Sequence, residues 1–311
     1  MATCLVTGAS GFVGGHLARA LADAGWATRA VGGSRSPVLP EAVAVLPGRD
    51  LGPDTPWADA LEDVEVLIHL AGLAHGRDGG DAAALRRVNV DGTLALADAA
   101  AQAGVRRFVF VSSVGVHGNA SADGPLREDS PLRPEAPYAE SKLAAERALR
   151  DRLAGRATEL VIVRPPLVYG PGAPGNPARL LRLVRSGLPL PLASVRNRRS
   201  FVSVANLCAA LLRCAEHPGA AGETFLVADP VVFSTPELLR ALARRCGRRA
   251  RLLPCPPALL RGAAALVGRA GDVDRLVADL EIDASRIARL LEFVPPQDAD
   301  AGLDAWVAGA P

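Results

Sequence analysis

Apolar segments of two kinds alternate along the first half of the chain. Short runs rich in β-branched residues have the length of strands, and each is followed by a longer segment whose apolar residues recur at helical spacing. The predicted strands cover residues 4–7, 28–31, 43–46, 64–72, 105–113 and 159–165. The predicted helices cover residues 12–25, 81–104 and 138–155. This alternation favours right-handed βαβ crossovers and a parallel sheet that is covered on both faces.

The pattern changes after the last of these strands. Residues 165–177 are dense in proline and glycine and predict a long functional loop. The later segments are mostly helical, with one further strand predicted at residues 223–229. We therefore predict an α/β fold with a doubly wound Rossmann domain over residues 1–165. A smaller, mostly helical substrate lobe follows over residues 166–311, with some chain crossing between the two, and closes over the crevice at the carboxyl end of the sheet.

Composition and charge exclude several classes of protein. The 311 residues include 35 basic and 33 acidic ones, so the net charge of +2 gives no sign of a nucleic-acid-binding surface. The one basic cluster that stands out, residues 185–199, could equally meet a diphosphate. Five cysteines without CxxC spacing predict reduced thiols and no metal site. No apolar run is long enough to span a bilayer and no secretory signal is visible, so we expect a cytoplasmic protein without membrane insertion.

Three glycines, Gly8, Gly11 and Gly14, stand three residues apart between the first predicted strand and the first helix. A strand that turns sharply into a helix aims backbone N–H groups and the positive end of a helix dipole at whatever lies above the turn. Gly8 permits the tight turn, Gly11 the close approach of a pyrophosphate, and Gly14 the packing of the helix on the sheet. The spacing indicates a dinucleotide site, and the alternative is that the turn is only a packing device.

The end of the second predicted strand bears on the choice of dinucleotide. An NAD-binding protein usually has a carboxylate there, which accepts hydrogen bonds from the adenosine ribose. Gly32 and Gly33 occupy that region in this chain, followed by Ser34 and Arg35. A serine and an arginine can hold a 2′-phosphate, which favours NADP over NAD. The alternative is that Arg35 is an ordinary exposed loop residue.

Candidate acid–base chemistry comes from Tyr138 and Lys142, which share one face of a predicted helix. A phenol with a pKa of about 10 is a poor base at neutral pH. We therefore expect the neighbouring ammonium, helped by the charge of a nicotinamide, to favour the phenolate. Ser113, at the end of a predicted strand, can hydrogen-bond the same substrate oxygen. Each feature alone is common, because such a pair often marks an ordinary helix surface and such a serine often only caps a turn.

Six segments carry these features in a fixed order: TGASGFVGGHL, LAGLAH, RRVNVDGT, FVSSVGVHG, YAESKLAAE and RPPLVYGPG. In this combination the chain resembles the extended short-chain dehydrogenase/reductases, specifically the NAD-dependent epimerase/dehydratase family of nucleotide-sugar enzymes. Within that family it is similar to bacterial UDP-hexose 4-epimerases and to related 4-ketoreductases of polysaccharide biosynthesis. The resemblance implies that Ser113, Tyr138 and Lys142 are the catalytic residues.

The resemblance also implies ligand contacts. For an NAD or NADP cofactor, the candidate residues are Gly8, Gly11, Phe12, Val13, Gly14, Ser34, Arg35, Asp50, Leu51, Leu70, Ala71, Gly72, Asn89, Tyr138, Lys142 and Arg164. Ser34 and Arg35 come from the phosphate argument above, because the family usually has a carboxylate in that region. For a UDP-linked sugar, they are His75, His117, Asn176, Leu190 and Arg199. Arg199 is the expected diphosphate clamp, because a guanidinium presents a planar fork of donors. His117 stands where these enzymes often have tyrosine, so a packed or solvated His117 is the alternative to a substrate contact.

The implied activity is epimerisation of a UDP-hexose by transient oxidation at sugar C4. The alternative is NAD(P)H-dependent reduction of a UDP-4-keto sugar, since both reactions need the same three catalytic residues. A dehydratase is disfavoured because Val114 and Gly115 leave no Asp-Glu pair after Ser113. A catalytically silent nucleotide-binding protein is the alternative of another class. The family also implies a homodimer, formed through the helices that carry Asn89 and Tyr138.

Overall fold

The computed structural model describes residues 2–33, 38–73, 81–266, 268 and 270–309. Its centre is a parallel sheet of seven strands in the order β3-β2-β1-β4-β5-β6-β9. These strands are β1 (Thr3–Thr7), β2 (Ala27–Val31), β3 (Val43–Leu46), β4 (Val66–His69), β5 (Arg107–Val111), β6 (Glu159–Arg164) and β9 (Thr224–Leu226). The chain moves outward in opposite directions from β1 and β4, which opens a crevice at the carboxyl ends of those strands. The structure confirms the predicted doubly wound α/β fold.

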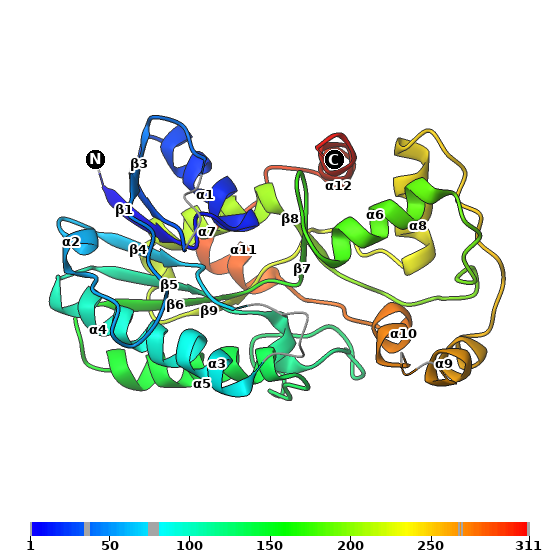
Figure 1. Cartoon of the computed structure of the whole chain (residues 1–311), viewed down its shortest axis with the longest axis horizontal. Helices are drawn as coiled ribbons and strands as arrows, with labels where there is room; N and C mark the ends of the chain where they lie inside the picture. Colours follow the sequence, from blue (N-terminus) through cyan, green and yellow to red (C-terminus); the bar gives the residue numbers. More distant parts are fainter. Residues whose placement is uncertain (1, 34–37, 74–80, 267, 269, 310–311) are drawn as a thin grey trace.

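Helices cover both faces of the sheet (Figure 1). One face packs against α1 (Phe12–Asp23) and α7 (Val204–Glu216), and the other against α4 (Thr93–Gln102) and α5 (Pro137–Leu153). Successive residues of a strand point to opposite faces, so each strand supplies both cores. In β5, for example, Val109 and Val111 face α7, whereas Phe108 and Phe110 face α4 and α5. This two-sided burial accounts for strands that are apolar throughout.

The predicted helix over residues 81–104 is confirmed as one unbroken helical run from Ala82 to Gln102, but the run has a π-helical stretch inside it. The segment consists of α3 (Ala82–Arg86), a π-helical stretch η1 (Arg87–Gly92) and then α4. A π-turn adds a residue to the helical repeat, and such turns occur mostly at functional sites. Here the added residue rotates Asn89 into the protein, where its side chain is 1% exposed.

The second lobe is built mainly from helices that pack around Tyr169 and Trp306. They are α6 (Asn176–Ser186), α8 (Thr235–Arg245), α9 (Pro257–Leu266), α10 (Ala270–Val277) and α12 (Ala299–Ala308). The predicted loop over residues 165–177 is in part wrong, because it contains β7 (Leu167–Tyr169), which pairs with β8 (Phe201–Ser203) as a small parallel sheet. Three-residue strands leave too little periodicity to be seen among prolines and glycines.

Several segments from the second half of the chain pack on the first domain. β9 pairs with β6 as the edge of the main sheet, and α7 and α11 (Ser285–Leu291) lie against the same core as α1. The division at residue 165 therefore stays a prediction about lobes, since later residues complete the sheet. The remaining short elements are α2 (Ala58–Leu61), η2 (Val114–His117) and η3 (Pro218–Ala220). Among the described residues, every helix is too short or too polar to cross a membrane.

Candidate active site

The glycine turn between β1 and α1 is shaped for close backbone approach. Gly8 has φ +75°, and a Cβ at this position would lie 2.7 Å from the Ala71 nitrogen. A Cβ on Gly14 would lie 2.2 Å from the Gly8 oxygen, so both glycines are needed for packing. A Cβ on Gly11 would meet only the Gly8 oxygen, at 3.1 Å, within 4 Å among the described residues. Gly11 therefore presents its open side to the crevice.

The first turn of α1 has backbone N–H groups that can donate hydrogen bonds at this opening. Gly11 is the N-cap residue, and no side chain caps the helix. Phe12, Val13 and Gly14 follow it, and N–H groups in the first turn of a helix have no intrahelical acceptor. A helix N-terminus of this kind suits an anionic ligand, so the turn fits the pyrophosphate of a dinucleotide.

The segment after β4 forms the next wall of the crevice, and Asn89 fixes it. The Asn89 side chain accepts a hydrogen bond from the Leu73 nitrogen at 2.8 Å and donates one to the Leu73 oxygen at 3.0 Å. It also donates to Ser141 Oγ at 2.9 Å, and Ser141 Oγ donates to the Tyr138 carbonyl at 2.7 Å. Asn89 therefore joins the wall to α5, and this geometry makes it a positioning residue.

Two of the three predicted catalytic residues, Ser113 and Lys142, lie at the carboxyl end of β5, and Tyr138 lies one helical turn before Lys142 on α5. Lys142 donates from Nζ to the Val111 carbonyl at 2.9 Å, and its ammonium lies 4.7 Å from the centroid of the Phe110 ring. Ser113 follows two residues after Val111, and its Oγ accepts a hydrogen bond from the Gly115 nitrogen at 3.1 Å. A Cβ on Gly115 would lie 3.3 Å from Ser113 Oγ and 3.5 Å from the Cβ of Ala139, the residue after Tyr138.

This cluster also adjoins the cofactor wall. A Cβ on Gly72 would lie 2.9 Å from Asn89 Oδ1 and 3.6 Å from Lys142 Nζ. The close approach is to Asn89 Oδ1, whereas the distance to Lys142 Nζ is an ordinary van der Waals contact. The loop after β4 and the acid–base pair of α5 therefore meet at one point of the crevice.

The protein alone does not favour the Tyr138 phenolate, so the expectation of a phenolate, which included the charge of a nicotinamide, stays a prediction. Burial raises the pKa of Tyr138 to about 12. Burial also lowers the pKa of Lys142 to about 8, against the opposing effect of the Glu146 carboxylate. The cost of burying an anion exceeds the help from the neighbouring ammonium. A further positive charge is needed before this phenol ionises near neutral pH.

Beneath Lys142 lies a buried ion pair between Glu146 and Arg164. Arg164 donates from Nε and Nη2 to the two carboxylate oxygens, at 2.9 and 2.5 Å. Its Nη1 lies 3.0 Å from His117 Nε2, so His117 accepts there and donates from Nδ1 to the Ser130 carbonyl at 3.1 Å. Burial, with the Arg164 charge, lowers the pKa of His117.

This arrangement supports the packed interpretation of His117. It also gives the Arg164 guanidinium protein partners, so the predicted contact between Arg164 and the cofactor gains no support from geometry. Glu146 lies one helical turn after Lys142, and both side chains are almost fully buried. The Glu146–Arg164 ion pair therefore helps to hold Lys142 in position.

His69 is a buried residue of this region that the sequence analysis missed. Its Nδ1 lies 2.7 Å from Thr7 Oγ1 and its Nε2 lies 2.9 Å from Thr93 Oγ1. Burial and the Lys142 charge lower the pKa of His69 to about 3, which keeps the ring neutral. The available signal was a polar residue at the carboxyl end of an otherwise apolar strand. The ring links β1, β4 and α4 below the crevice.

In the second lobe, Arg199 is the predicted substrate residue with the most suitable environment. Its Nη1 donates to the Ala278 carbonyl at 3.0 Å, and in the described part of the chain no carboxylate forms an ion pair with it. Burial lowers its pKa, with Asp279 opposing. Asn176 is exposed at the start of α6, and Leu190 is held by backbone bonds to the segment around Leu252. The structure therefore does not bring Asn176 and Leu190 into contact with the catalytic cluster.

The remaining predicted contacts divide into two groups. Ser34, Arg35 and His75 lie outside the described residues. Asp50 is exposed, whereas Leu51 packs so closely on Gly92 that a Cβ there would lie 2.9 Å from Leu51 Cγ. Both flank the loop after β3, on the side of the crevice where β2 ends.

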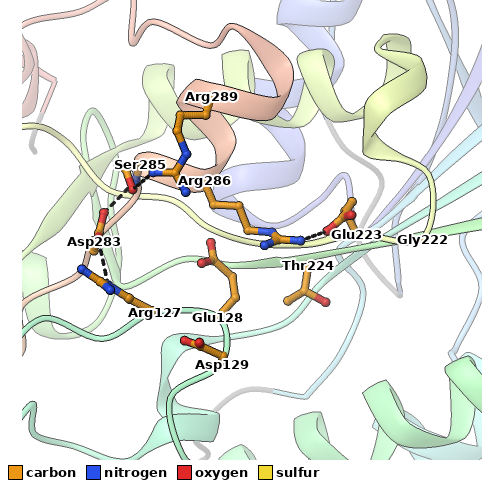
Figure 2. A pocket seen from close by; sticks show the side chains of 10 residues that line it. All are labelled: Arg127, Glu128, Asp129, Gly222, Glu223, Thr224, Asp283, Ser285, Arg286 and Arg289. Carbon is orange, nitrogen blue, oxygen red and sulfur yellow. Dashed lines mark hydrogen bonds and ion pairs between the residues drawn. The ribbon is translucent and has the colours of Figure 1, made fainter.

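A cavity of about 490 Å³ lies elsewhere, at the outer edge of the sheet beside β9 and α11 (Figure 2). Two of its arginines are paired, Arg127 with Asp283 and Arg286 with Glu223. Glu128 joins this cavity to the buried ion pair, because its side chain accepts from the Leu226 nitrogen at 2.9 Å and its carbonyl accepts from Arg164 Nη1 at 3.4 Å. None of the predicted site residues that the structure describes lines this cavity.

A parallel sheet with a glycine turn, and a serine, a tyrosine and a lysine at the end of its fifth strand, defines the class of extended short-chain dehydrogenase/reductases. Comparison with known proteins gives the family within this class. The chain belongs to the NAD-dependent epimerase/dehydratase family, whose model matches residues 4–228.

Individual relatives agree with this assignment. The chain is 36% identical to a UDP-glucose 4-epimerase of Vibrio cholerae over 96% of its own length and 92% of that protein. It is 32% identical to a GDP-6-deoxy-D-mannose reductase of Pseudomonas aeruginosa, over 76% and 78% of the two chains. Among solved structures, it is similar to MoeE5 in complex with UDP-glucuronic acid and NAD, with a TM-score of 0.80, 28% identity and coverage of 99% and 98%.

Proposed function

We propose that the chain is an NAD(P)-dependent nucleotide-sugar epimerase, which inverts C4 of a UDP-hexose by transient oxidation. The observation that carries the proposal is that Ser113 and Lys142 lie at the end of β5, beside the open glycine turn, with Tyr138 one helical turn before Lys142 on α5. The Vibrio relative and the ligands of MoeE5 support a UDP-linked sugar as the substrate. Cytoplasmic location and a homodimer formed through the helices of Asn89 and Tyr138 stay predictions.

The residues divide the chemistry among them. When bound, an oxidised nicotinamide cofactor supplies the hydride acceptor and a positive charge near the phenol. Tyr138 takes the proton of the sugar 4-hydroxyl and returns it from the phenol in the reverse step. Ser113 already accepts a hydrogen bond at Oγ, so its own hydrogen is available to the sugar oxygen. Lys142 holds its positive charge between β5 and the phenol-bearing turn of α5.

The substrate diphosphate is assigned to Arg199. Its guanidinium is desolvated and forms no ion pair with a described carboxylate, so a bound dianion supplies the missing charge. For the cofactor, NAD is supported by the complexes of MoeE5. A preference for NADP is the finer proposal, and it depends on the absence of a carboxylate at Gly32.

One alternative function has an observation in its favour. A reductase must release its oxidised cofactor after each turnover, and Gly32 removes the ribose contact that retains NAD in typical epimerases. The reductase of Pseudomonas aeruginosa is a relative of this chain. We therefore keep NAD(P)H-dependent 4-keto reduction of a nucleotide sugar as the second candidate.

The test is incubation of the purified chain with UDP-glucose, UDP-N-acetylglucosamine or a UDP-4-keto-6-deoxy sugar, with and without NADH or NADPH. Epimer formation without added reductant, at constant nicotinamide absorbance, supports the epimerase. Stoichiometric loss of absorbance with the keto sugar supports the reductase and overturns the epimerase. If neither reaction occurs and no cofactor binds, both proposals fail and the protein is a silent member of the family.

A further inference from the structure

The outer end of the second lobe carries an unusual run of charge. Between Glu237 and Asp272 the sequence has eight arginines and no acidic residue, in a chain whose overall charge is close to balance. This run is separate from the basic cluster at residues 185–199 and was missed in the sequence analysis. It covers α8, α9 and the connection between them, which Figure 1 places at the end of the lobe away from the seven-stranded sheet.

Several of these arginines have no local counter-charge. Arg244, Arg248, Arg249 and Arg251 are exposed and form no ion pair among the described residues. Arg245 in the same run is different, because Asp300 and Asp304 of α12 pair with it. The connection after α8 therefore presents a cluster of unneutralised guanidinium groups to its surroundings.

Apolar side chains are exposed on the same end of the lobe. No residue of α9 is buried, and Leu259, Ala263 and Leu266 lie on one face of it at spacings of four and three residues. Leu259 is 65% exposed and Leu266 is 89% exposed. The other side of α9 packs against α10. The free face of α9 is therefore apolar over two turns.

Two more leucines connect this face to the arginines. Leu253 is 52% exposed, and its nitrogen donates to the Leu190 oxygen at 2.8 Å. Leu188 is 60% exposed and lies on the same surface, because a Cβ on the preceding Gly187 would lie 3.1 Å from Arg248 Nη1. Leu188 and Leu253 therefore lie on the same end of the lobe as the unpaired arginines, and the chain continues from Leu253 into α9.

We propose that this surface, formed by α9, Leu188, Leu253, Arg248, Arg249 and Arg251, docks the enzyme on an anionic lipid bilayer. Leucines on one helix face, flanked by arginines, match the two signals of interfacial membrane binding: shallow apolar insertion and attraction to anionic headgroups. A nucleic acid would use the charge and leave the leucines in water. A second copy of this chain would bring the same unneutralised arginines against each other. An anionic lipid surface can both bury the leucines and neutralise the arginines.

The experiment is co-sedimentation of the full chain with vesicles of phosphatidylcholine alone or of equimolar phosphatidylcholine and phosphatidylglycerol. Binding is expected only to the mixed vesicles and should weaken as salt is added. Replacing Arg248, Arg249 and Arg251 together by glutamate should reduce partitioning by about a hundredfold or more, since each juxtamembrane arginine contributes about fivefold. The double change Leu259→Glu and Leu266→Glu should also reduce it strongly while leaving the charge cluster in place.

Matched controls test whether the location of the changes matters. Arg86, Arg133 and Arg147 are exposed arginines of the first domain, and changing them together to glutamate alters the net charge equally. Leu290→Glu with Val294→Glu removes exposed apolar side chains of another surface. Both control variants should bind like the unchanged chain, and circular dichroism should show that all four are folded.

Three results would overturn the proposal. The first is no difference between the two kinds of vesicle at low salt. The second is vesicle binding that survives the leucine changes, because that is charge-driven adsorption, which any polyanion can share. The third is a dimer, measured by light scattering, that the leucine changes split while vesicle binding is absent, since the surface would then join two copies of the chain. None of these measurements depends on the proposed epimerase activity.

Discussion

Two desolvated arginines, Arg164 of the main sheet and Arg199 of the second lobe, differ in whether a carboxylate neutralises their charge. On the side of the main sheet, Arg164 is paired with Glu146 through two short hydrogen bonds, and both side chains are almost fully buried. On the side of the second lobe, Arg199 is also desolvated, but its one hydrogen-bond acceptor is the Ala278 carbonyl and no described carboxylate pairs with it. The charge of Arg164 is neutralised within the protein, whereas the charge of Arg199 is available to an anionic ligand.

The difference teaches which part of the site is rigid before any ligand binds. His69, Asn89 and Lys142 on the sheet side all have protein partners that fix their positions. Such groups hold the acid–base geometry in place without help from the substrate. Arg199 has a cost of desolvation that an anionic substrate relieves, so it contributes to binding more than to folding.

The largest effect should come from Tyr138→Phe. It removes the phenol that takes and returns the proton of the sugar 4-hydroxyl, so turnover should fall by about a thousandfold. The melting temperature should change little. Steady-state assays and thermal melts measure the two quantities.

The other tyrosine of the chain is a matched control. Tyr169 donates to Asp229 at 2.7 Å inside the second lobe. Tyr169→Phe should cost about 1.5–3 kcal/mol of stability, since a hydrogen bond to a charged group is lost, and should leave turnover nearly unchanged. Equal loss of turnover in the two variants would remove the special role of Tyr138.

The next effect concerns the pair beneath Lys142. Arg164→Met leaves the buried Glu146 carboxylate with only the half-exposed Arg150 3.6 Å away, so the free energy of unfolding should fall by about 3–5 kcal/mol. Urea denaturation measures this change. Adding Glu146→Leu removes the orphaned charge and should restore most of the loss. A double variant as unstable as the single one would show that packing, not the buried charge, sets the cost.

Arg199→Met should weaken ligand binding and leave the stability of the protein unreduced. Stability without ligand should be unchanged or slightly higher, because the guanidinium has been desolvated without an ion-pair partner. Affinity for UDP and for the UDP-sugar should fall by about 10- to 100-fold, as expected for the loss of charge-assisted hydrogen bonds. Isothermal titration measures the affinity. Weakened binding of free UDP is the critical result, and unchanged UDP affinity would place the diphosphate elsewhere.

The sequence was sufficient for features with a local cause. Strand-length apolar runs predicted all seven strands of the main sheet, and the glycine spacing predicted the turn at Gly8 and Gly14, where a Cβ would collide with backbone. Tyr138 and Lys142 lie on α5 as their spacing requires. These features depend on periodicity and on steric limits of the backbone, which a sequence records directly.

Features that depend on tertiary contacts could not be predicted. The π-helical turn at Asn89 exists because its side chain reaches Leu73 and Ser141, which are distant in sequence. The pairing of Arg164 with Glu146 likewise joins β6 to α5, so a residue assigned to the cofactor proved to have a partner inside the protein. The pKa of Tyr138 rises through burial, which residue spacing does not report.

The smallest predicted effect is in the pH profile. Lys142 has a pKa of about 8 because burial disfavours its charged form. Its positive charge, which supports the phenolate, is therefore present below about pH 8 and is lost as the pH rises through that value. kcat/KM should fall by half at pH 8 and by about tenfold one pH unit higher, if a single proton controls the limb.

Measuring kcat/KM between neutral and alkaline pH, with cofactor saturating, tests whether deprotonation of Lys142 causes the fall of kcat/KM at alkaline pH. Lys142→Met should be slow at every pH and should lose the inflection near 8, because the titrating group is gone. An inflection that persists in Lys142→Met belongs to another group, and a limb in the unchanged enzyme near pH 10 would mean that Lys142 keeps its ordinary pKa. In that case the ammonium would be more solvated than its hydrogen bond to Val111 and its contact with Phe110 indicate, and the sheet side of the crevice would be less rigid than the comparison with Arg199 requires.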